Sequence, residues 1–348
     1  MLGGGGRGGA GQIGGGPGTG LGPGAGGSIG FGTTGVGGVT NCGGIERPAV
    51  PAGLDVLLVV AASASMDWDA TNATCPGGCG ATSRWAQATT AINTIVAETQ
   101  STVGWGLKLV PEDRAGLCTV AAEPTLPVAV DDASSMAAAL ALRTSANGGV
   151  SNGGNNASRA AVEVAASHLS KLTDDNRRMI VLVTDGVPNC PAAGVAAADD
   201  PDRAVQAIAQ AAAMGYPTFV VGFAPEWEAY PILDRMAVAG GTGRTAPLAF
   251  FAVANTSDLT TGLRRIVADS ARCVFTIPPP PTNDGTTTRS TISVSIDGLP
   301  VPHDGGRANG WDHTDDSAGH LQFYGPVCDN VMAKPDARVT VNFLCLLK

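Results

Sequence analysis

Two long aliphatic runs in this chain each end abruptly at small polar residues. The run at residues 54–60 leads into Ala61-Ala62-Ser63-Ala64-Ser65, and the run at residues 179–184 leads into Asp185-Gly186-Val187. Near-continuous runs of Val, Leu and Ile are typical of strands that are buried on both faces of a parallel sheet. Because ligands of open α/β sheets bind beyond the carboxyl ends of such strands, we expect these serines and this aspartate to lie at a crevice.

Between residues 54 and 271 the hydrophobic pattern alternates between strand and helix. Strands are expected at residues 54–60, 103–110, 178–184, 217–222 and 248–254, and helices at residues 83–100, 133–143, 158–172, 202–214, 231–239 and 257–271. The Pro-interrupted segment 119–130 predicts a short antiparallel edge strand. This rhythm predicts an α/β fold, a doubly wound and mostly parallel sheet with helices on both faces.

The residues at the strand ends resemble those of the von Willebrand factor type A domain. That family carries a metal-ion-dependent adhesion site written Asp-x-Ser-x-Ser after the first strand, with a Thr on a second loop and an Asp-Gly after a later strand. Here the first segment reads Ala61-x-Ser63-x-Ser65, whereas Thr184-Asp185-Gly186 is intact. The second loop reads Gly154-Asn155-Asn156-Ala157-Ser158 and puts Asn156 where the coordinating Thr belongs. The resemblance covers roughly residues 54–271.

The resemblance implies a divalent cation, Mg²⁺ or alternatively Mn²⁺ or Ca²⁺, on a degenerate ligand set of Ser63, Ser65, Asn156 and Asp185. Mg²⁺ prefers oxygen ligands, and an open coordination position admits a carboxylate of a partner. Ala61 supplies no oxygen, so metal affinity falls about 10- to 100-fold if the missing carboxylate acts through water. Asn156 still offers a carbonyl oxygen, and Asp67 or Asp69 could approach the site. Weak metal binding and a site kept only as fold geometry both remain open.

Composition divides the chain into three segments. Residues 1–44 hold 23 of the 49 glycines, and we expect a disordered tether there because few side chains can be buried. Residues 45–272 form the expected type A domain. Residues 273–348 follow with a Pro-rich linker at 278–281 and alternating strands at 292–296 and 339–343. Asp297-Gly298 after the first of these strands predicts a hairpin, so we expect a small C-terminal β unit.

The cysteines suit disulfides in an oxidising compartment, which predicts an extracytoplasmic protein, whether secreted, periplasmic or cell-surface. They are Cys42, Cys75, Cys79, Cys118, Cys190, Cys273, Cys328 and Cys345. Of the 105 complete connectivities we favour Cys75 with Cys79, Cys118 with Cys190, and Cys273 with Cys328 or Cys345. Zinc at Cys75 and Cys79, or at His313 and His320, is the alternative.

No apolar signal core follows Met1, so we expect a signal segment or lipid anchor upstream of the given start.

Several function classes are disfavoured. A net charge of −9 with 15% charged residues provides no basic footprint for nucleic acid. We expect no transmembrane segment. Ser63 and Ser65 have no obvious base partner and no Gly-x-Ser-x-Gly elbow, and His168 falls on a helix surface, so we expect no enzyme. Trp68, beside the crevice, is interpreted as a lid over the first helix.

These observations predict an exported, non-enzymatic binding or adhesion protein. The loops around Ser63, Ser65, Asn156 and Asp185 are expected to contact a protein or peptide partner, with weak or lost metal binding. The alternative is a metal-independent envelope scaffold that works through its C-terminal β unit.

Overall fold

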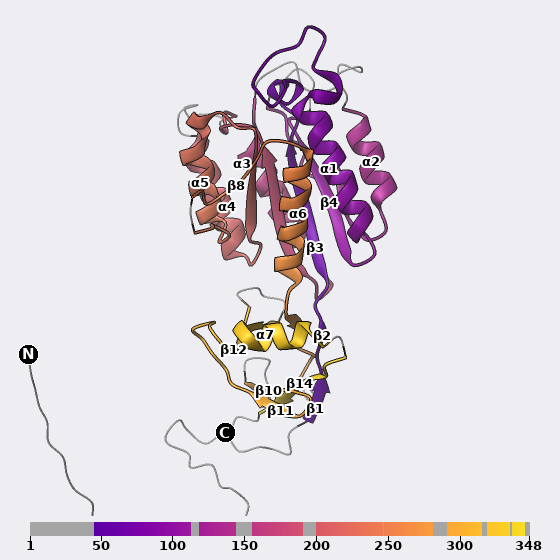
Figure 1. Ribbon diagram of the computed structural model, residues 1–348, viewed down its shortest axis with the longest axis vertical. Coiled ribbons are helices and arrows are strands. Elements are labelled where there is room, and N and C mark those ends of the chain that lie inside the picture. Colours follow the sequence, from indigo (N-terminus) through magenta and orange to yellow (C-terminus); the bar gives the residue numbers. More distant parts are fainter. Residues whose placement is uncertain are drawn as a thin grey trace, which may run out of the picture. The chain divides into compact units, whose positions relative to one another are not determined.

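The computed structural model describes residues 45–112, 118–143, 155–190, 200–245, 247–280, 291–314, 319–334 and 336–344. These residues form an α/β domain and a β-rich unit (Figure 1). The expected tether, residues 1–44, lies outside the described residues.

A six-stranded sheet forms the centre of the α/β domain within the described residues. From edge to edge its strands are β5 (Leu126–Ala129), β4 (Val103–Val110), β3 (Leu54–Ala61), β6 (Arg177–Thr184), β7 (Thr218–Phe223) and β8 (Phe251–Val253). All neighbouring strands are parallel except β4 and β5, which are antiparallel. The predicted doubly wound parallel sheet and its short antiparallel edge strand are therefore confirmed.

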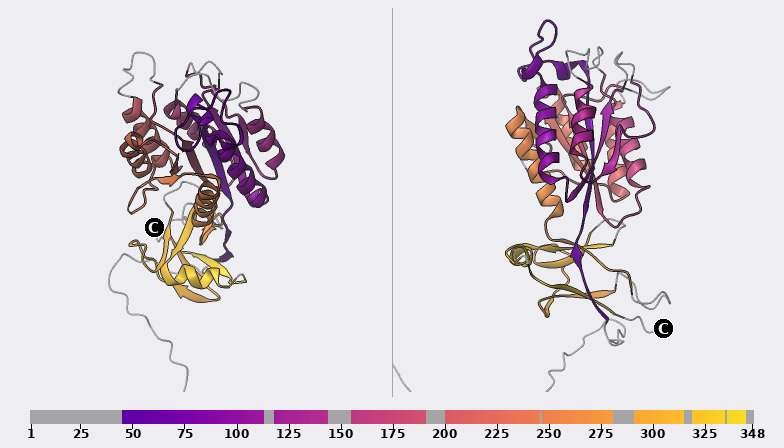
Figure 2. Two further views of the ribbon diagram at one scale, coloured as in Figure 1. Left: turned by 45° about the horizontal axis from the view of Figure 1, so that its top comes forward. Right: turned by 90° about the vertical axis from the view of Figure 1, so that its right-hand side faces the viewer.

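Helices cover both faces of this sheet, as the right-hand view of Figure 2 shows. One layer contains α1 (Arg84–Thr99), α2 (Ala133–Ala141) and α6 (Thr256–Ala271), and the other contains α3 (Ser158–Leu169), α4 (Asp200–Ala213) and α5 (Tyr230–Ala239). Strand β3 separates two apolar cores. Val56, Leu58 and Val60 face the α1 layer. Leu57 and Val59 face the α3 layer. All eight residues of β3 are buried, which explains the unbroken aliphatic run.

The β-rich unit has two four-stranded sheets within the described residues. The first contains β1 (Ile45–Pro48), β14 (Val339–Phe343), β10 (Ile292–Ile296) and β11 (Leu299–Val301), and the second contains β12 (Gly310–His313), β13 (His320–Tyr324), β9 (Val274–Thr276) and β2 (Val50–Pro51). Helix α7 (Gly325–Met332) follows β13. The hairpin predicted at Asp297-Gly298 joins β10 to β11, and both turn residues have positive φ, 51° and 79°.

The first strands of the chain belong to this β-rich unit by their pairing. β1 pairs antiparallel with β14, and β2 pairs antiparallel with β9. Composition predicts that residues 45–51 belong to the segment 45–272. In the structure, these residues pair with strands that lie after residue 273. Two short strands cannot be assigned to distant partners from local pattern alone, because the pairing spans nearly the whole chain.

Three disulfide bonds lie within the described residues: Cys75–Cys79, Cys118–Cys190 and Cys273–Cys328. The favoured pairings are confirmed, and Cys75 and Cys79 are not a zinc pair because they bond each other. Cys42 and Cys345 lie outside the described residues. No helix in the described part of the chain is long and apolar enough to cross a membrane.

Candidate functional site

The carboxyl ends of β3 and β6 bring the predicted serines and aspartate together. Ser63 and Ser65 follow β3 directly, and Asp185 follows β6. The Ser63 hydroxyl donates a hydrogen bond to Asp185 Oδ1 at 3.2 Å, and the Oγ atoms of Ser63 and Ser65 are 3.0 Å apart. The neighbouring parallel strands β3 and β6 therefore produce the expected cluster.

These three side chains form a chain of hydrogen bonds with one direction. A hydroxyl has a single proton to donate. Because Ser63 donates to Asp185, it accepts from the Ser65 hydroxyl. Ser63 is buried and Ser65 is half-buried. Within the described residues, the lone pairs of Ser65 Oγ are therefore free to accept a further hydrogen bond.

A residue that the sequence did not reveal, Arg84, completes the site. Its Nη1 lies 3.1 Å from Asp185 Oδ2, and the side chains of Arg84 and Asp185 are 1% and 2% exposed. Arg84 also donates to the carbonyl oxygen of Ser65 at 3.4 Å and to the amide oxygen of Asn72. The guanidinium is thus held by partners from three segments of the chain.

Arg84 is the first residue of α1, which makes its charge unusual there. Ser83 is the N-cap and accepts from the backbone N–H of Ala86 at 3.1 Å. A cation near a helix N-terminus is unfavourable because it meets the positive end of the helix dipole. Asp185 compensates this charge across the crevice. In the sequence, Arg84 is recognisable only as a charged residue directly after a helix cap. That pattern by itself does not show which residue pairs with it.

The Asn156 side chain has its hydrogen bonds with the loop around Asp185 and with Ser158, and within the described residues it has none with Ser63 or Ser65. Its amide nitrogen donates to Thr184 Oγ1 and, at 3.2 Å, to the carbonyl oxygen of Gly186. Its amide oxygen accepts from the backbone N–H of Ser158 at 3.2 Å and from the Ser158 hydroxyl. Asn156 therefore ties the start of α3 to the loop after β6.

Asp67 and Asp69, the two other carboxylates considered for this site, lie in different surroundings. Asp69 Oδ1 accepts from the Thr71 backbone N–H, the Thr71 hydroxyl and the Ala73 backbone N–H at 2.7–2.9 Å. The bond from the Thr71 hydroxyl is the largest cause of a pKa of Asp69 below its ordinary value, followed by that from Ala73. This carboxylate holds its own loop. Asp67 is half-buried in the short helical turn η1 (Ala64–Asp67).

A cavity of about 320 Å³ opens at this cluster. Its wall includes Ser65, Trp68, Arg84, Asp185, Glu226 and Glu228. The two glutamates come from η5 (Trp227–Ala229) and the residue before it, which follow strand β7. The cavity therefore lies at the carboxyl ends of β3, β6 and β7, where open α/β sheets bind ligands.

Residues 56–187 match the family model of the von Willebrand factor type A domain. This stretch runs from β3 to the loop after β6 and contains the three clustered residues. This part of the chain is therefore similar to a von Willebrand factor type A domain. Comparison with curated proteins found no significant match.

Solved structures with a similar fold include three bacterial proteins. They are the minor pilin PilB from Streptococcus sanguinis (14% identity, TM-score 0.47, 64% of this chain and 62% of that one), the pilus adhesin SpaC from Lactobacillus rhamnosus GG in its open conformation (12%, 0.46, 85% and 39%), and the conserved hypothetical protein BatB from Bacteroides thetaiotaomicron (18%, 0.44, 63% and 99%). This chain thus spans 62% of the minor pilin and 39% of the adhesin. At these identities and TM-scores the likeness says nothing about function.

The residues at this type A site do not fit a divalent cation. Ala61 is fully buried and offers no oxygen. Both oxygens of Asp185 already accept hydrogen bonds, one from Ser63 and one from Arg84. The Asn156 amide oxygen is engaged by Ser158. The guanidinium of Arg84 adds a positive charge that repels a metal ion at the same carboxylate.

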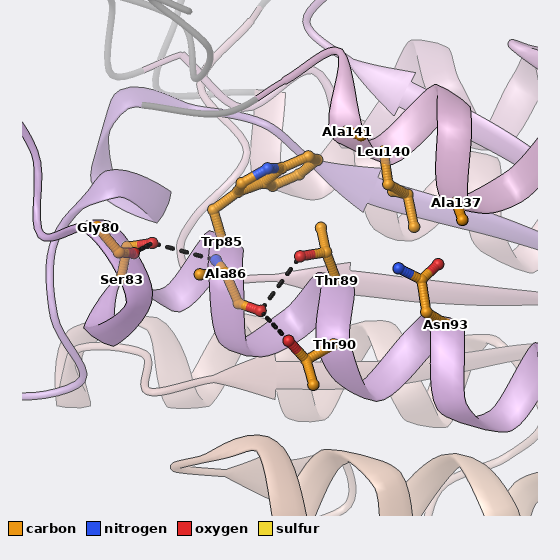
Figure 3. Close-up of a pocket in the computed structure, with 10 residues that line it drawn as sticks. All are labelled: Gly80, Ser83, Trp85, Ala86, Thr89, Thr90, Asn93, Ala137, Leu140 and Ala141. Carbon is orange, nitrogen blue, oxygen red and sulfur yellow. Dashed lines mark hydrogen bonds between the residues drawn. The ribbon is translucent and has the colours of Figure 1, made fainter. Parts of the chain in front are cut away.

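A second cavity, of about 380 Å³, lies between α1 and α2 (Figure 3). Trp85 and Leu140 form its apolar walls. The hydroxyls of Thr89 and Thr90 bond back to the carbonyl oxygen of Ala86 at 3.1 and 2.7 Å. The amide oxygen of Asn93 has no hydrogen-bond partner within the described residues. This single acceptor contrasts with the convergent polar groups of the crevice, so the crevice is the stronger candidate.

Two histidines of the described residues, His168 and His320, lie close to backbone groups of distant segments. His168 Nε2 accepts from the backbone N–H of Val128 at 3.3 Å, and burial lowers the pKa of this histidine. His320 is buried, with Nε2 2.6 Å from the carbonyl oxygen of Asp175. Among the described residues no group of three or more His, Cys, Asp or Glu side chains could hold a metal. The zinc alternative at His313 and His320 therefore has no support.

Proposed function

We propose that this protein is an exported, non-enzymatic binding protein whose type A domain captures a protein or peptide partner without a divalent cation. The observation that carries the proposal is the buried pair of Arg84 and Asp185. In this arrangement the guanidinium supplies the positive charge that the aspartate requires in its buried position.

The energetics of that pair favour a metal-free site. A metal ion would coordinate Asp185 only after the Arg84 bond is given up. Breaking a buried ion pair costs about 3–5 kcal/mol. Such a cost lowers metal affinity by a factor of at least roughly 100. We therefore expect the site to hold no metal at millimolar concentration.

Two further features support an exported binding role. Three disulfides lie in the described residues and suit an oxidising compartment. In the crevice, the Ser63 hydroxyl donates to a carboxylate, and no histidine of the described residues lines the cavity. That carboxylate is engaged by Arg84, so the hydroxyl has no free base to take its proton and is a weak nucleophile. The site therefore favours recognition over catalysis.

Calorimetric titration of the full chain with Mg²⁺ and Mn²⁺ tests the proposal. We expect no saturable heat at millimolar metal and no change in thermal midpoint with chelator. The variant Ala61→Asp/Arg84→Ala/Asn156→Thr restores the family pattern and is the positive control. Metal at a hundred times its Kd should stabilise that variant by about 2.7 kcal/mol. Saturable metal binding by the unaltered protein, lost in Asp185→Asn, would overturn the proposal.

A further inference from the structure

We propose that the crevice of the type A domain takes a basic side chain, a lysine or an arginine, presented by the protein partner. This inference rests on the metal-free binding function proposed above. The partner would then present a positive side chain, whereas a metal-dependent site takes a negatively charged carboxylate.

The first argument is the supply of hydrogen-bond acceptors. Among the residues that the structure describes, the directed chain from Ser65 through Ser63 to Asp185 leaves the lone pairs of Ser65 Oγ free. Ser65 lines the cavity and is half-buried. An ammonium or guanidinium group has only donors to offer, so it matches such an acceptor.

The second argument is charge. Asp185 is neutralised by Arg84, whereas Glu226 and Glu228 line the cavity with exposed side chains. Within the described residues, neither glutamate has a side-chain hydrogen bond or ion pair. The cavity therefore has two uncompensated negative charges at its rim. These charges would repel an acidic ligand and attract a basic one.

The third argument is the aromatic surface beside these charges. Trp227 lies between the two glutamates in the chain and is 75% exposed, whereas Trp68 forms part of the cavity wall and is half-buried. A cation that lies over an indole face is attracted by the electron density of the ring. Indole rings next to carboxylates therefore suit the alkyl stem and charged head of a long basic side chain.

Arg84 contributes a donor that fits the backbone of the presented peptide. Arg84 is 1% exposed and lines the cavity, and its Nε has no hydrogen-bond partner within the described residues. An unsatisfied buried donor is unfavourable. A peptide carbonyl oxygen beside the basic side chain would accept from one N–H of Arg84 without adding charge. A carboxylate in the same place would add a full negative charge, which would itself need a partner.

The test uses the full chain and three end-blocked tripeptides, Gly-Lys-Gly, Gly-Arg-Gly and Gly-Glu-Gly. Binding is followed by nuclear magnetic resonance on the indole N–H signals of Trp68 and Trp227, which are assigned with Trp68→Phe and Trp227→Phe. We expect saturable shifts of both signals with the lysine and arginine peptides and none with the glutamate peptide. Added salt should weaken the binding.

Charge variants locate the effect. Glu226→Gln and Glu228→Gln should each weaken binding of the lysine peptide by roughly two- to fivefold, as expected for exposed ion pairs. Glu46→Gln is the matched control, because Glu46 is an exposed glutamate of β1 and loses the same charge. It should leave the Kd unchanged. All variants are compared only where their thermal midpoints equal that of the unaltered protein.

The outcomes separate this inference from the proposed function. Preference for the glutamate peptide, or the absence of any shift with the basic peptides, overturns the basic-ligand assignment and leaves the metal-free site intact. Equal weakening by Glu46→Gln also overturns it, because the effect would then be net charge. Saturable metal binding in the calorimetric titration overturns the proposed function instead.

Discussion

Arg84 and Asp185 are 101 positions apart in the chain, yet Nη1 of the arginine lies 3.1 Å from Oδ2 of the aspartate. Both side chains are almost fully buried. The pair connects the start of α1 with the loop after β6, at the point where a metal-dependent type A domain would hold its cation. The crevice of this domain thus has an internal cation that is part of the polypeptide.

Removing the guanidinium should destabilise the domain strongly. Arg84→Ala leaves Asp185 buried without its charge partner, and we expect a loss of about 3–5 kcal/mol in the free energy of unfolding. Urea denaturation followed by tryptophan fluorescence measures this loss. Arg265→Ala is the control, because Arg265 pairs with Asp269 at the surface, and it should cost less than about 1 kcal/mol. Equal costs for the two variants would contradict the structural role of the buried pair.

The two serines should differ in their contribution to stability. Ser63 is 1% exposed and donates to Asp185, so Ser63→Ala removes a hydrogen bond to a charged group and should cost about 1.5–3 kcal/mol. Ser65 is half-buried, and in the described part of the chain its hydroxyl bonds only that of Ser63, so Ser65→Ala should cost about 1 kcal/mol or less. The same urea series ranks them. A larger cost for Ser65→Ala would contradict this ranking and the hydrogen-bond arrangement behind it.

The disulfides should stabilise the fold in the order of the loops they close. Cys118–Cys190 spans 72 positions and Cys273–Cys328 spans 55, whereas Cys75–Cys79 spans 4. Loop-closure entropy predicts a loss of about 4 kcal/mol for either long bridge and about 2 kcal/mol for the short one. Paired Cys→Ala variants compared by urea midpoints test this order. The prediction fails if loss of the short bridge is the most damaging.

Asp55 should make the protein less stable as the pH rises toward neutrality. Burial first and repulsion by Asp174 second raise its pKa from 3.8 to about 6, although a hydrogen bond from Asn176 and the charge of Arg178 lower it. The folded state therefore binds this proton more tightly than the unfolded chain does. The contribution to stability is complete below pH 3.8 and is lost as pH rises through about 6.

The variant Asp55→Asn tests this dependence. An amide cannot ionise, so we expect a flatter profile of unfolding free energy across that window and a more stable protein at neutral pH. Asp297→Asn is the opposite control. The Arg338 backbone N–H, and then Lys334, hold the pKa of Asp297 below its ordinary value, so its contribution is lost as the pH falls. A variant profile that is as steep as that of the unaltered protein would exclude Asp55 as the source.

Much of the α/β domain could be predicted from its hydrophobic pattern. The buried strand β3 and the strand β6 were expected within one or two residues, because strands buried on both faces leave unbroken aliphatic runs. The convergence of Ser63, Ser65 and Asp185 followed from the same reasoning, since parallel strands align their carboxyl ends. The pairing of Cys118 with Cys190 was also favoured in advance.

By itself, then, the sequence determined the parallel sheet, its helices and the strand ends that form the crevice, because these depend on local periodicity. Only the tertiary structure decided what lies in that crevice. Arg84, Glu226 and Glu228 come from segments whose local pattern carries no sign of a shared site, and folding alone brings them to one cavity. The pairing of β1 with β14 is decided in the same way, because a four-residue strand has no local feature that selects its partner.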